Sequence, residues 1–264
     1  MRAPSLIEVV DILHEIAPLE LAADWDNTGL LLQPRARAGA VRRALLTIDL
    51  TEPVVAEAKK VRADLVVSYH PPIFQPVKRL VHDDPRQRVL LAAAAAGFAV
   101  YSPHTALDAA PSGLADWLVE GVLDGAVPRE VRPCGAGEFG RVVAVGKAIP
   151  FQALLQRLRR HLRVRDLRVA LPERKKAAAR TIAVAAGAGA SVLRGERADV
   201  WVTGELSHHD ALAATAAGIA VVCAGHSNTE RGFLPVLKRR LRSAFGNDLD
   251  VRIAASDRDP FVTA

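Results

Sequence analysis

Two histidines in this 264-residue chain are each followed, four residues later, by a carboxylate. One pattern runs from His104 to Asp108 and the other from His226 to Glu230. One turn of helix, or a tight loop, can aim both side chains of such a pair at a single point. Imidazole and carboxylate together are ligands that suit Zn, Mn and Fe, whereas Mg or Ca prefers oxygen ligands alone. The spacing therefore indicates a metal site.

The ends of four strand-like runs carry residues of the same chemical types. In open α/β sheets ligands bind at the carboxyl ends of the strands, because loops converge there without disturbing the core. The residues and the runs before them are His70 after 65–69, His104 after 99–102, Glu205 after 200–203, and His226 after 219–223.

His70 also precedes Pro71 and Pro72, which keep the backbone extended and rigid. A single histidine at a strand end is more often a hydrogen-bonded loop residue than a ligand, so the expectation depends on the set as a whole. We expect the metal ligands to be His70, His104, Asp108, His226 and Glu230.

The two carboxylates of this set bear on the number of ions. Asp108 and Glu230 can each bridge a pair of ions. Two ions about 3.5 to 4 Å apart can activate a water and stabilise charge on a transferring or leaving oxygen. We therefore expect two divalent ions per chain, which are Zn, Mn or Fe.

The segment from Glu205 to Asp210 has two interpretations. In the simpler one, Ser207 caps the next helix and Asp210 favours its positive end. In the functional one, Glu205, His208 or His209 lies beside the metal site, where it supports a ligand, carries a proton or contacts the substrate. We take Glu205 and His209 as the candidate catalytic residues that move a proton.

A second polar segment, residues 24–29, reads Asp-Trp-Asp-Asn-Thr-Gly. It is typical of a polar turn leading into the apolar residues 30–32. The acids beside an aromatic residue also suit a loop that lines a pocket.

The elements that position these residues alternate along the chain. Apolar runs at 44–50, 65–69 and 99–102 alternate with helical stretches, which is typical of β-α-β units and of a largely parallel sheet covered on both faces. A similar series begins after 127–140, where prolines and glycines suppress regular structure. We expect a helix at 190–197 in this second series.

The two series predict two similar layered α/β domains. A first helix is expected over 5–17, with Ser5 as its cap, and a last helix over 229–245. The final strand, 250–253, is expected to return to the first sheet and so to interlock the domains. The predicted domains are 1–127, completed by 228–264, and 128–227.

The composition bears on the binding partners and on the cellular location of the protein. The net charge is +6, and basic residues gather at 157–168 and 238–242 without interleaved aromatic residues. A solvated surface is favoured over a nucleic-acid groove, although the charge could steer anionic substrates. Two cysteines make no disulfide framework, which favours the cytoplasm, and the apolar run 89–101 is too short to cross a membrane.

The sequence contains no P-loop and no Gly-x-Ser-x-Gly motif. Its Gly-x-Gly-x-x-Gly run, residues 135–140, lies in a turn-rich segment and precedes an expected strand rather than the helix that a dinucleotide-binding motif requires. A dinucleotide enzyme, a kinase and a serine hydrolase are therefore disfavoured.

Several segments together resemble a dinuclear-metal family, the GTP cyclohydrolase I type 2 homologues, also named Ngg-interacting-factor-three-like proteins. Each segment alone is weak evidence for the family. The set, however, spans most of the chain, and the segments follow one another in the same order as in the family. The segments are Trp25–Leu30, Ser68–Phe74, Ser102–Pro111, Thr203–Glu205 and Gly225–Gly232.

The resemblance implies two similar α/β domains with a two-metal site at their junction, and a ring-shaped homo-oligomer, a hexamer. It implies ligand roles for His70, Asp108, His226 and Glu230. His104 would be a further ligand or a close support.

One position departs from the family pattern. Many relatives have a His-His pair where this chain has Tyr69-His70, and a phenol with a pKa of about 10 is a poor ligand unless a metal lowers that pKa. One ion would then be bound less tightly, or would differ in identity. The segment with Tyr69 resembles the eukaryotic branch of the family.

We therefore carry three hypotheses. The first is a metal-dependent hydrolase, similar to a GTP cyclohydrolase, in which a metal-activated water attacks a nucleotide or another phosphorylated small molecule. The second is a metal-stabilised scaffold or regulatory partner without turnover. The third and least favoured is nucleic-acid binding, which would weaken steeply with salt.

Overall fold

The computed structural model describes residues 2–34, 39–174 and 177–261, which form two compact units. The first unit comprises Met1–Leu107 and Leu234–Ala264, and the second comprises Asp108–Phe233. Both units contain a sheet and helices, so the expectation of two layered α/β domains is confirmed. The exact domain bounds expected from the sequence stay a prediction.

The first unit contains a sheet with the strand order β1-β4-β3-β2-β11. Four of the strands are parallel and β1 runs antiparallel to β4 at one edge. The last strand of the chain pairs with β2, which places Val251 opposite Ala44 and confirms that the chain end returns to the first sheet. The strands are β1 (Gly29–Leu32), β2 (Arg43–Thr47), β3 (Leu65–Ser68), β4 (Ala99–Ser102) and β11 (Asp250–Ile253).

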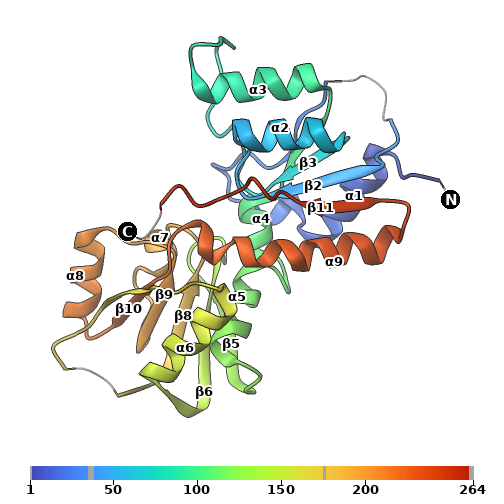
Figure 1. Ribbon diagram of the computed structural model, residues 1–264. Helices are drawn as coiled ribbons and strands as arrows, with labels where there is room; N and C mark the ends of the chain where they lie inside the picture. Colours follow the sequence, from blue (N-terminus) through green and yellow to red (C-terminus); the bar gives the residue numbers. More distant parts are fainter. Residues whose placement is uncertain (1, 35–38, 175–176, 262–264) are drawn as a thin grey trace. The chain divides into compact units, whose positions relative to one another are not determined.

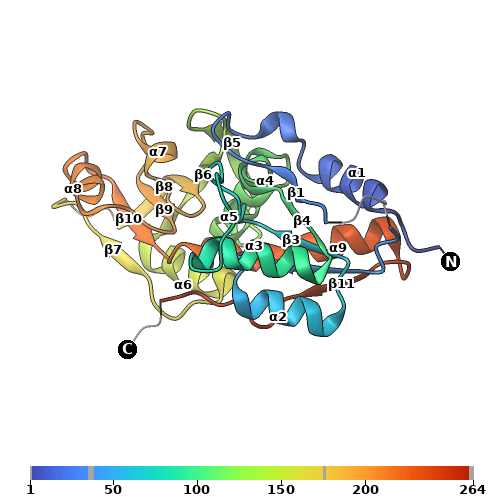
Figure 2. The same cartoon turned by 90° about the horizontal axis from the view of Figure 1, so that it is seen from above.

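Helices cover both faces of this sheet (Figure 1). Helices α2 (Glu52–Val61) and α3 (Pro85–Ala96) lie on one face (Figure 2). Their apolar side chains pack on Leu45, Val66 and Val100. Helices α1 (Leu6–Ile16) and α9 (Leu234–Phe245) lie on the other face and contact each other. The expected cap of α1 is confirmed, since Ser5 and Glu8 form a capping box.

The second unit contains a six-stranded sheet with the order β5-β6-β8-β9-β10-β7. Strands β8, β9 and β10 are parallel, and the other three run antiparallel to their neighbours. The strands are β5 (Pro128–Cys134), β6 (Gly140–Pro150), β7 (Arg168–Ala170), β8 (Ala178–Ala185), β9 (Val200–Thr203) and β10 (Ala220–Cys223).

Two pairs of helices cover the second sheet. Helices α5 (Leu114–Leu123) and α6 (Phe151–Leu162) pack together over β6 and β8. Helices α7 (Ala190–Leu193) and α8 (His208–Ala216) place Leu193 and Ala214 in a core with Ala183, Trp201 and Val221. Ser207 caps α8 by accepting a hydrogen bond from the backbone N–H of Asp210, as the sequence predicts.

Basic side chains of α6 are paired within this unit. Arg157 donates two hydrogen bonds to the carbonyl groups of Val122 and Leu123, at the end of α5, and Arg160 pairs with Asp124. These arginines therefore stabilise the C-terminus of α5.

Three expectations for the elements were wrong. Residues 127–140 were expected to lack regular structure but contain β5, whose prolines are tolerated because this is an edge strand. The helix expected over 190–197 is only α7, and Gly195 with φ +89° follows its end. The last helix begins at Leu234 rather than 229, after two 3₁₀ turns, and this start places Pro235 in its first turn.

Other elements had no counterpart in the expected series. They are β1, β7, α5 and the short helix α4 (His104–Ala109). Helix α5 is apolar and almost wholly buried, so it lacks the polar face that would reveal a helix in the sequence. Within the described residues, no helix has the length and hydropathy needed to span a membrane.

Candidate metal centre

The expected strand-end positions are found in both units. His70 follows β3 by two residues, and His104 likewise follows β4. In the second unit, Glu205 follows β9 and His226 follows β10. The sequence therefore predicted correctly which ends of the strands carry these side chains.

In the first unit, both histidines contact a carboxylate through Nδ1. Nδ1 of His70 lies 2.9 Å from Oδ1 of Asp49, and Nδ1 of His104 lies 2.8 Å from Oδ1 of Asp26. An ionised carboxylate only accepts, so Nδ1 is the donor and Nε2 is the nitrogen that can bind a metal. The two imidazole rings have centroids 5.4 Å apart.

The carboxylate of Asp26 is held in the ionised form. Burial raises its pKa, but hydrogen bonds from His104 and Thr105 outweigh burial and bring the pKa below its usual value. Thr105 donates both its hydroxyl and its backbone N–H to this carboxylate. Asp26 therefore fixes the start of α4 as well as the ring of His104.

His104 has a backbone conformation that is rare for a residue with a side chain. Its φ is +27°, in the left-handed region, where a Cβ is crowded. Such strain costs on the order of 1–3 kcal/mol and persists only where surrounding contacts impose it. Here the contacts are those of Asp26 with the ring of His104 and with Thr105.

Tyr69 is buried beside these histidines. Its ring centroid lies 5.0 Å from that of His70 and 5.5 Å from that of His104. Its backbone N–H donates to the carbonyl of Thr47, which continues the pairing of β2 and β3. The phenol therefore occupies space next to both imidazoles.

In the second unit, His226 lies between two carboxylates. Nδ1 of His226 lies 2.8 Å from Oε1 of Glu205, and Nε2 lies 3.3 Å from Oε1 of Glu230. The side chain of Glu230 is buried, with 2 % of its surface exposed, whereas that of Glu205 is half exposed. His226 and Glu230 together could hold a metal ion, with one nitrogen and one oxygen ligand.

A glycine keeps the space beside these two atoms open. An added Cβ at Gly187 would lie 2.8 Å from Oε1 of Glu230 and 2.9 Å from Nε2 of His226. Gly204 permits an equally close approach, since its Cβ would lie 2.6 Å from the carbonyl oxygen of Gly187. The backbone around His226 and Glu230 therefore leaves room for an ion, and the donor set fits one.

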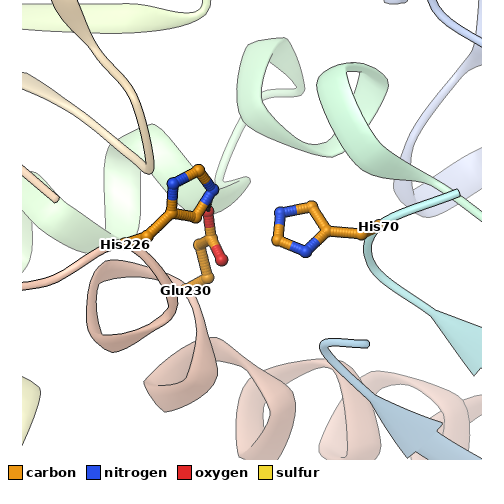
Figure 3. A group of neighbouring side chains, drawn as sticks. All are labelled: His70, His226 and Glu230. Atoms are coloured by element: carbon orange, nitrogen blue, oxygen red, sulfur yellow. Dashed lines mark ion pairs between the residues drawn. The ribbon is translucent and has the colours of Figure 1, made fainter. Parts of the chain in front are cut away.

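Two further expected site residues, Asp108 and His209, lie on the helices α4 and α8. Asp108 is half-buried on α4, one helical turn after His104, and His209 is exposed in the first turn of α8. Figure 3 draws three of the expected ligands: His226 and Glu230 from the second unit, and His70 from the first. Each of these three offers one atom that can bind a metal ion.

Asp49 was not singled out in the sequence, although it binds His70. A signal was present, because Asp49 follows β2 as His70 follows β3. Asp26 lies in the segment that the sequence suggested as a pocket loop, but its contact with His104 could not be read from the spacing.

Comparison with known proteins identifies the relatives of this chain. The model of the family described as Duf34/NIF3 (NGG1p interacting factor 3) matches residues 4–260. The protein NIF3 homolog of Schizosaccharomyces pombe is 41% identical over 268 residues, which cover 96% of this chain and 95% of the relative.

Two solved structures are similar throughout. The Bacillus cereus protein related to NIF3 has a TM-score of 0.84 at 18% identity, and the alignment covers 100% of both chains. Reduced HcgD from Methanocaldococcus jannaschii has a TM-score of 0.84 at 25% identity, with 96% of this chain and 98% of that chain covered. With the family match over nearly its whole length, this chain belongs to the Duf34/NIF3 (NGG1p interacting factor 3) family.

Proposed function

We propose that this protein is a metal-dependent hydrolase that acts on a nucleotide or another phosphorylated small molecule, as a GTP cyclohydrolase-like enzyme would. The observation that carries the proposal is the contact of a carboxylate with Nδ1 of His70, His104 and His226. Imidazole ligands of metal ions are typically oriented in this way, by a carboxylate or carbonyl on the second ring nitrogen.

The neighbours of His226 give the strongest support. With Nδ1 donating to Glu205, Nε2 faces the buried carboxylate of Glu230. Two arrangements place a favourable partner between His226 and both carboxylates. Either the ring is a protonated imidazolium, or it is a neutral imidazole whose Nε2 shares a cation with Glu230. We favour the cation, because Gly187 leaves space beside both atoms.

The proposed ligand set also includes residues of the first unit. If two ions are bound, Glu230 would be the preferred ligand to both, His226 would hold one ion, and Asp108 with His70 would hold the other. His104 is a further ligand or a support. We propose two ions per chain, chosen from Zn, Mn and Fe.

Bound divalent ions would lower the pKa of water and stabilise negative charge on a phosphoryl oxygen. The protein contributes the orientation of its imidazoles through Asp26, Asp49 and Glu205. We propose that Glu205 or His209 moves the proton, since both side chains are exposed and can exchange it with solvent.

The test combines metal content with turnover. The protein is stripped with a chelator, repleted with Mn, Fe or Zn, and assayed by elemental analysis and for hydrolysis of nucleotides. We expect two ions per chain, and we expect His226→Ala to lose both an ion and hydrolysis while His82→Ala, at an exposed loop position, retains both. Less than one ion per repleted chain would refute the proposal.

A second function is favoured by the description of the family as an interacting factor. In this alternative the protein is a metal-stabilised scaffold or regulatory partner without turnover. The variant His226→Ala separates the two functions. If the wild type shows no measurable hydrolysis and His226→Ala loses assembly, the scaffold is supported.

The proposed assembly rests on the family resemblance, and the proposed location rests on the cysteines. We propose a ring-shaped hexamer, which sedimentation would report as about six times the 28.2 kDa chain mass. We propose a cytoplasmic location, supported by the free thiols of Cys134 and Cys223. Binding to nucleic acid is disfavoured and would show as an affinity that falls steeply with salt.

A further inference from the structure

Two exposed aromatic side chains contact each other beside His104, all within the first unit. Trp25 and Phe74 have ring centroids 5.9 Å apart and meet edge to face. Each ring centroid also lies 6.3 Å from that of His104. Trp25 is 62% exposed and Phe74 is 44% exposed, which is unusual for rings that gain free energy by burial.

The loops that carry these rings are anchored on both sides of Trp25. The backbone N–H of Ala23 donates to the hydroxyl of Thr105 at 3.0 Å, and Asp26 binds both Thr105 and His104. Asn27 donates from its side chain to the carbonyl of Ile73, which ties this loop to the one that carries Phe74. The exposure of Trp25 therefore belongs to a fixed loop conformation.

We propose that Trp25 and Phe74 bind the planar aromatic ring of the substrate, and that His104 lies between this ring and the phosphate of the same substrate. This inference rests on the proposed function, because His104 belongs to the proposed metal site. Every heteroaromatic base presents a π-face that can stack on such side chains. The substrate class is then a phosphorylated compound with a planar ring rather than a sugar phosphate alone.

The tryptophans of the chain provide a direct reporter. Of the three, Trp117 and Trp201 are each only 7% exposed. Quenching of the exposed tryptophan by iodide therefore reports Trp25. Protection from iodide is expected when AMP binds to the metal-loaded protein, and no protection is expected with ribose 5-phosphate, which lacks the ring.

Affinities measured by calorimetry test the roles of the two rings. Trp25→Leu and Phe74→Leu keep an apolar side chain but remove the π-face. We expect each to weaken AMP binding by about tenfold or more and to leave ribose 5-phosphate binding unchanged. Phe261→Leu is the matched control, because Phe261 is 84% exposed and lies in the C-terminal segment.

The outcomes separate this inference from the proposed function. Equal AMP affinities for wild type and Trp25→Leu would overturn the inference even if two ions were bound. If the repleted wild type held less than one ion per chain and its AMP affinity still depended on Trp25, the inference would be supported and the metal-dependent function refuted. If Trp25→Leu changed sedimentation but not AMP affinity, the surface would be a contact between copies of the chain and the inference would be wrong.

Discussion

Glu205 accepts a hydrogen bond from Nδ1 of His226 at 2.8 Å, although the two residues follow different strands. The contact fixes the imidazole with Nε2 toward Glu230.

Replacing this carboxylate by an amide should weaken metal binding without unfolding the protein. A Glu205→Gln side chain keeps the shape but loses the charge, and loss of such a supporting carboxylate typically costs about 10- to 100-fold in metal affinity. Competition with a chelator of known affinity measures the effect. Glu120→Gln, at an exposed position on α5, should bind metal as the wild type does. Equal affinities for both variants would contradict the role of Glu205.

A methyl group at Gly187 should block the proposed ion. Its Cβ would lie within 3 Å of both Glu230 and His226, and φ is +53°. Gly218→Ala is a matched control, because Gly218 also has positive φ but no atom within 4 Å of an added Cβ. Both variants should lose about 1–2 kcal/mol of unfolding free energy through the backbone. Elemental analysis should show lost metal only in Gly187→Ala, and equal metal content would remove the argument for a cation here.

Position 69 should control how tightly the second ion binds. Tyr69→His restores an imidazole beside His70, so the second ion should dissociate more slowly from this variant than from the wild type. Tyr69→Phe keeps the buried ring and removes only the hydroxyl. If the phenol is not a ligand, Tyr69→Phe should retain the wild-type metal content, whereas a loss of metal would show that the hydroxyl binds an ion.

The C-terminal segment should support the loop that carries His70. Oδ2 of Asp257 accepts a hydrogen bond from the backbone N–H of Ile48 at 2.8 Å, and the carbonyl of Ile48 accepts from the N–H of His70 at 3.0 Å. Asp257→Ala leaves a buried N–H without this acceptor, which should cost about 1–3 kcal/mol in denaturant unfolding. Asp11→Ala, at an exposed position on α1, should change stability far less, and equal losses would refute the support role.

Stability should fall in mild acid because of His161. Its ring stacks on Trp117 with centroids 4.2 Å apart, and burial lowers its pKa, an effect partly offset by the Trp117 carbonyl and Asp124. The unfolded chain, with a histidine pKa of about 6.5, then binds the proton more readily than the folded chain. Stability is therefore lost as pH falls through about 6.5 toward the folded pKa, by at most about 1.4 kcal/mol per pH unit.

The measurement is the unfolding free energy from pH 7.5 to pH 5. His161→Gln cannot titrate and should show a shallower slope than the wild type. His82→Gln, at an exposed position, should keep the wild-type slope. An unchanged slope in His161→Gln would show that other groups cause the acid sensitivity.

The placement of the ligand-type side chains could be predicted because it depends on local patterns. Runs of apolar residues locate β3, β4, β9 and β10, and the polar residue after each run must lie at the carboxyl end. The contacts that orient these side chains could not be predicted in the same way. Asp26 reaches His104 only because β1 pairs with β4, and no sequence spacing records that pairing.

The strand β5 shows a second limit of the sequence. Pro128 and Pro133 normally end regular structure, yet an edge strand needs only one row of backbone hydrogen bonds. Whether a strand lies at an edge is decided by the whole sheet. The pattern of residues therefore showed a segment rich in proline and glycine but not the hairpin that β5 forms with β6.

The order of the segments has a consequence for biosynthesis. The second unit is one continuous stretch, whereas the first unit needs α9 and β11 from the end of the chain. During translation, the second unit can fold while the first unit still lacks α9 and the edge strand β11. The edge of β2 then stays unpaired until residues 250–253 have emerged, so a nascent chain stalled before Asp250 exposes a strand edge that is open to aggregation.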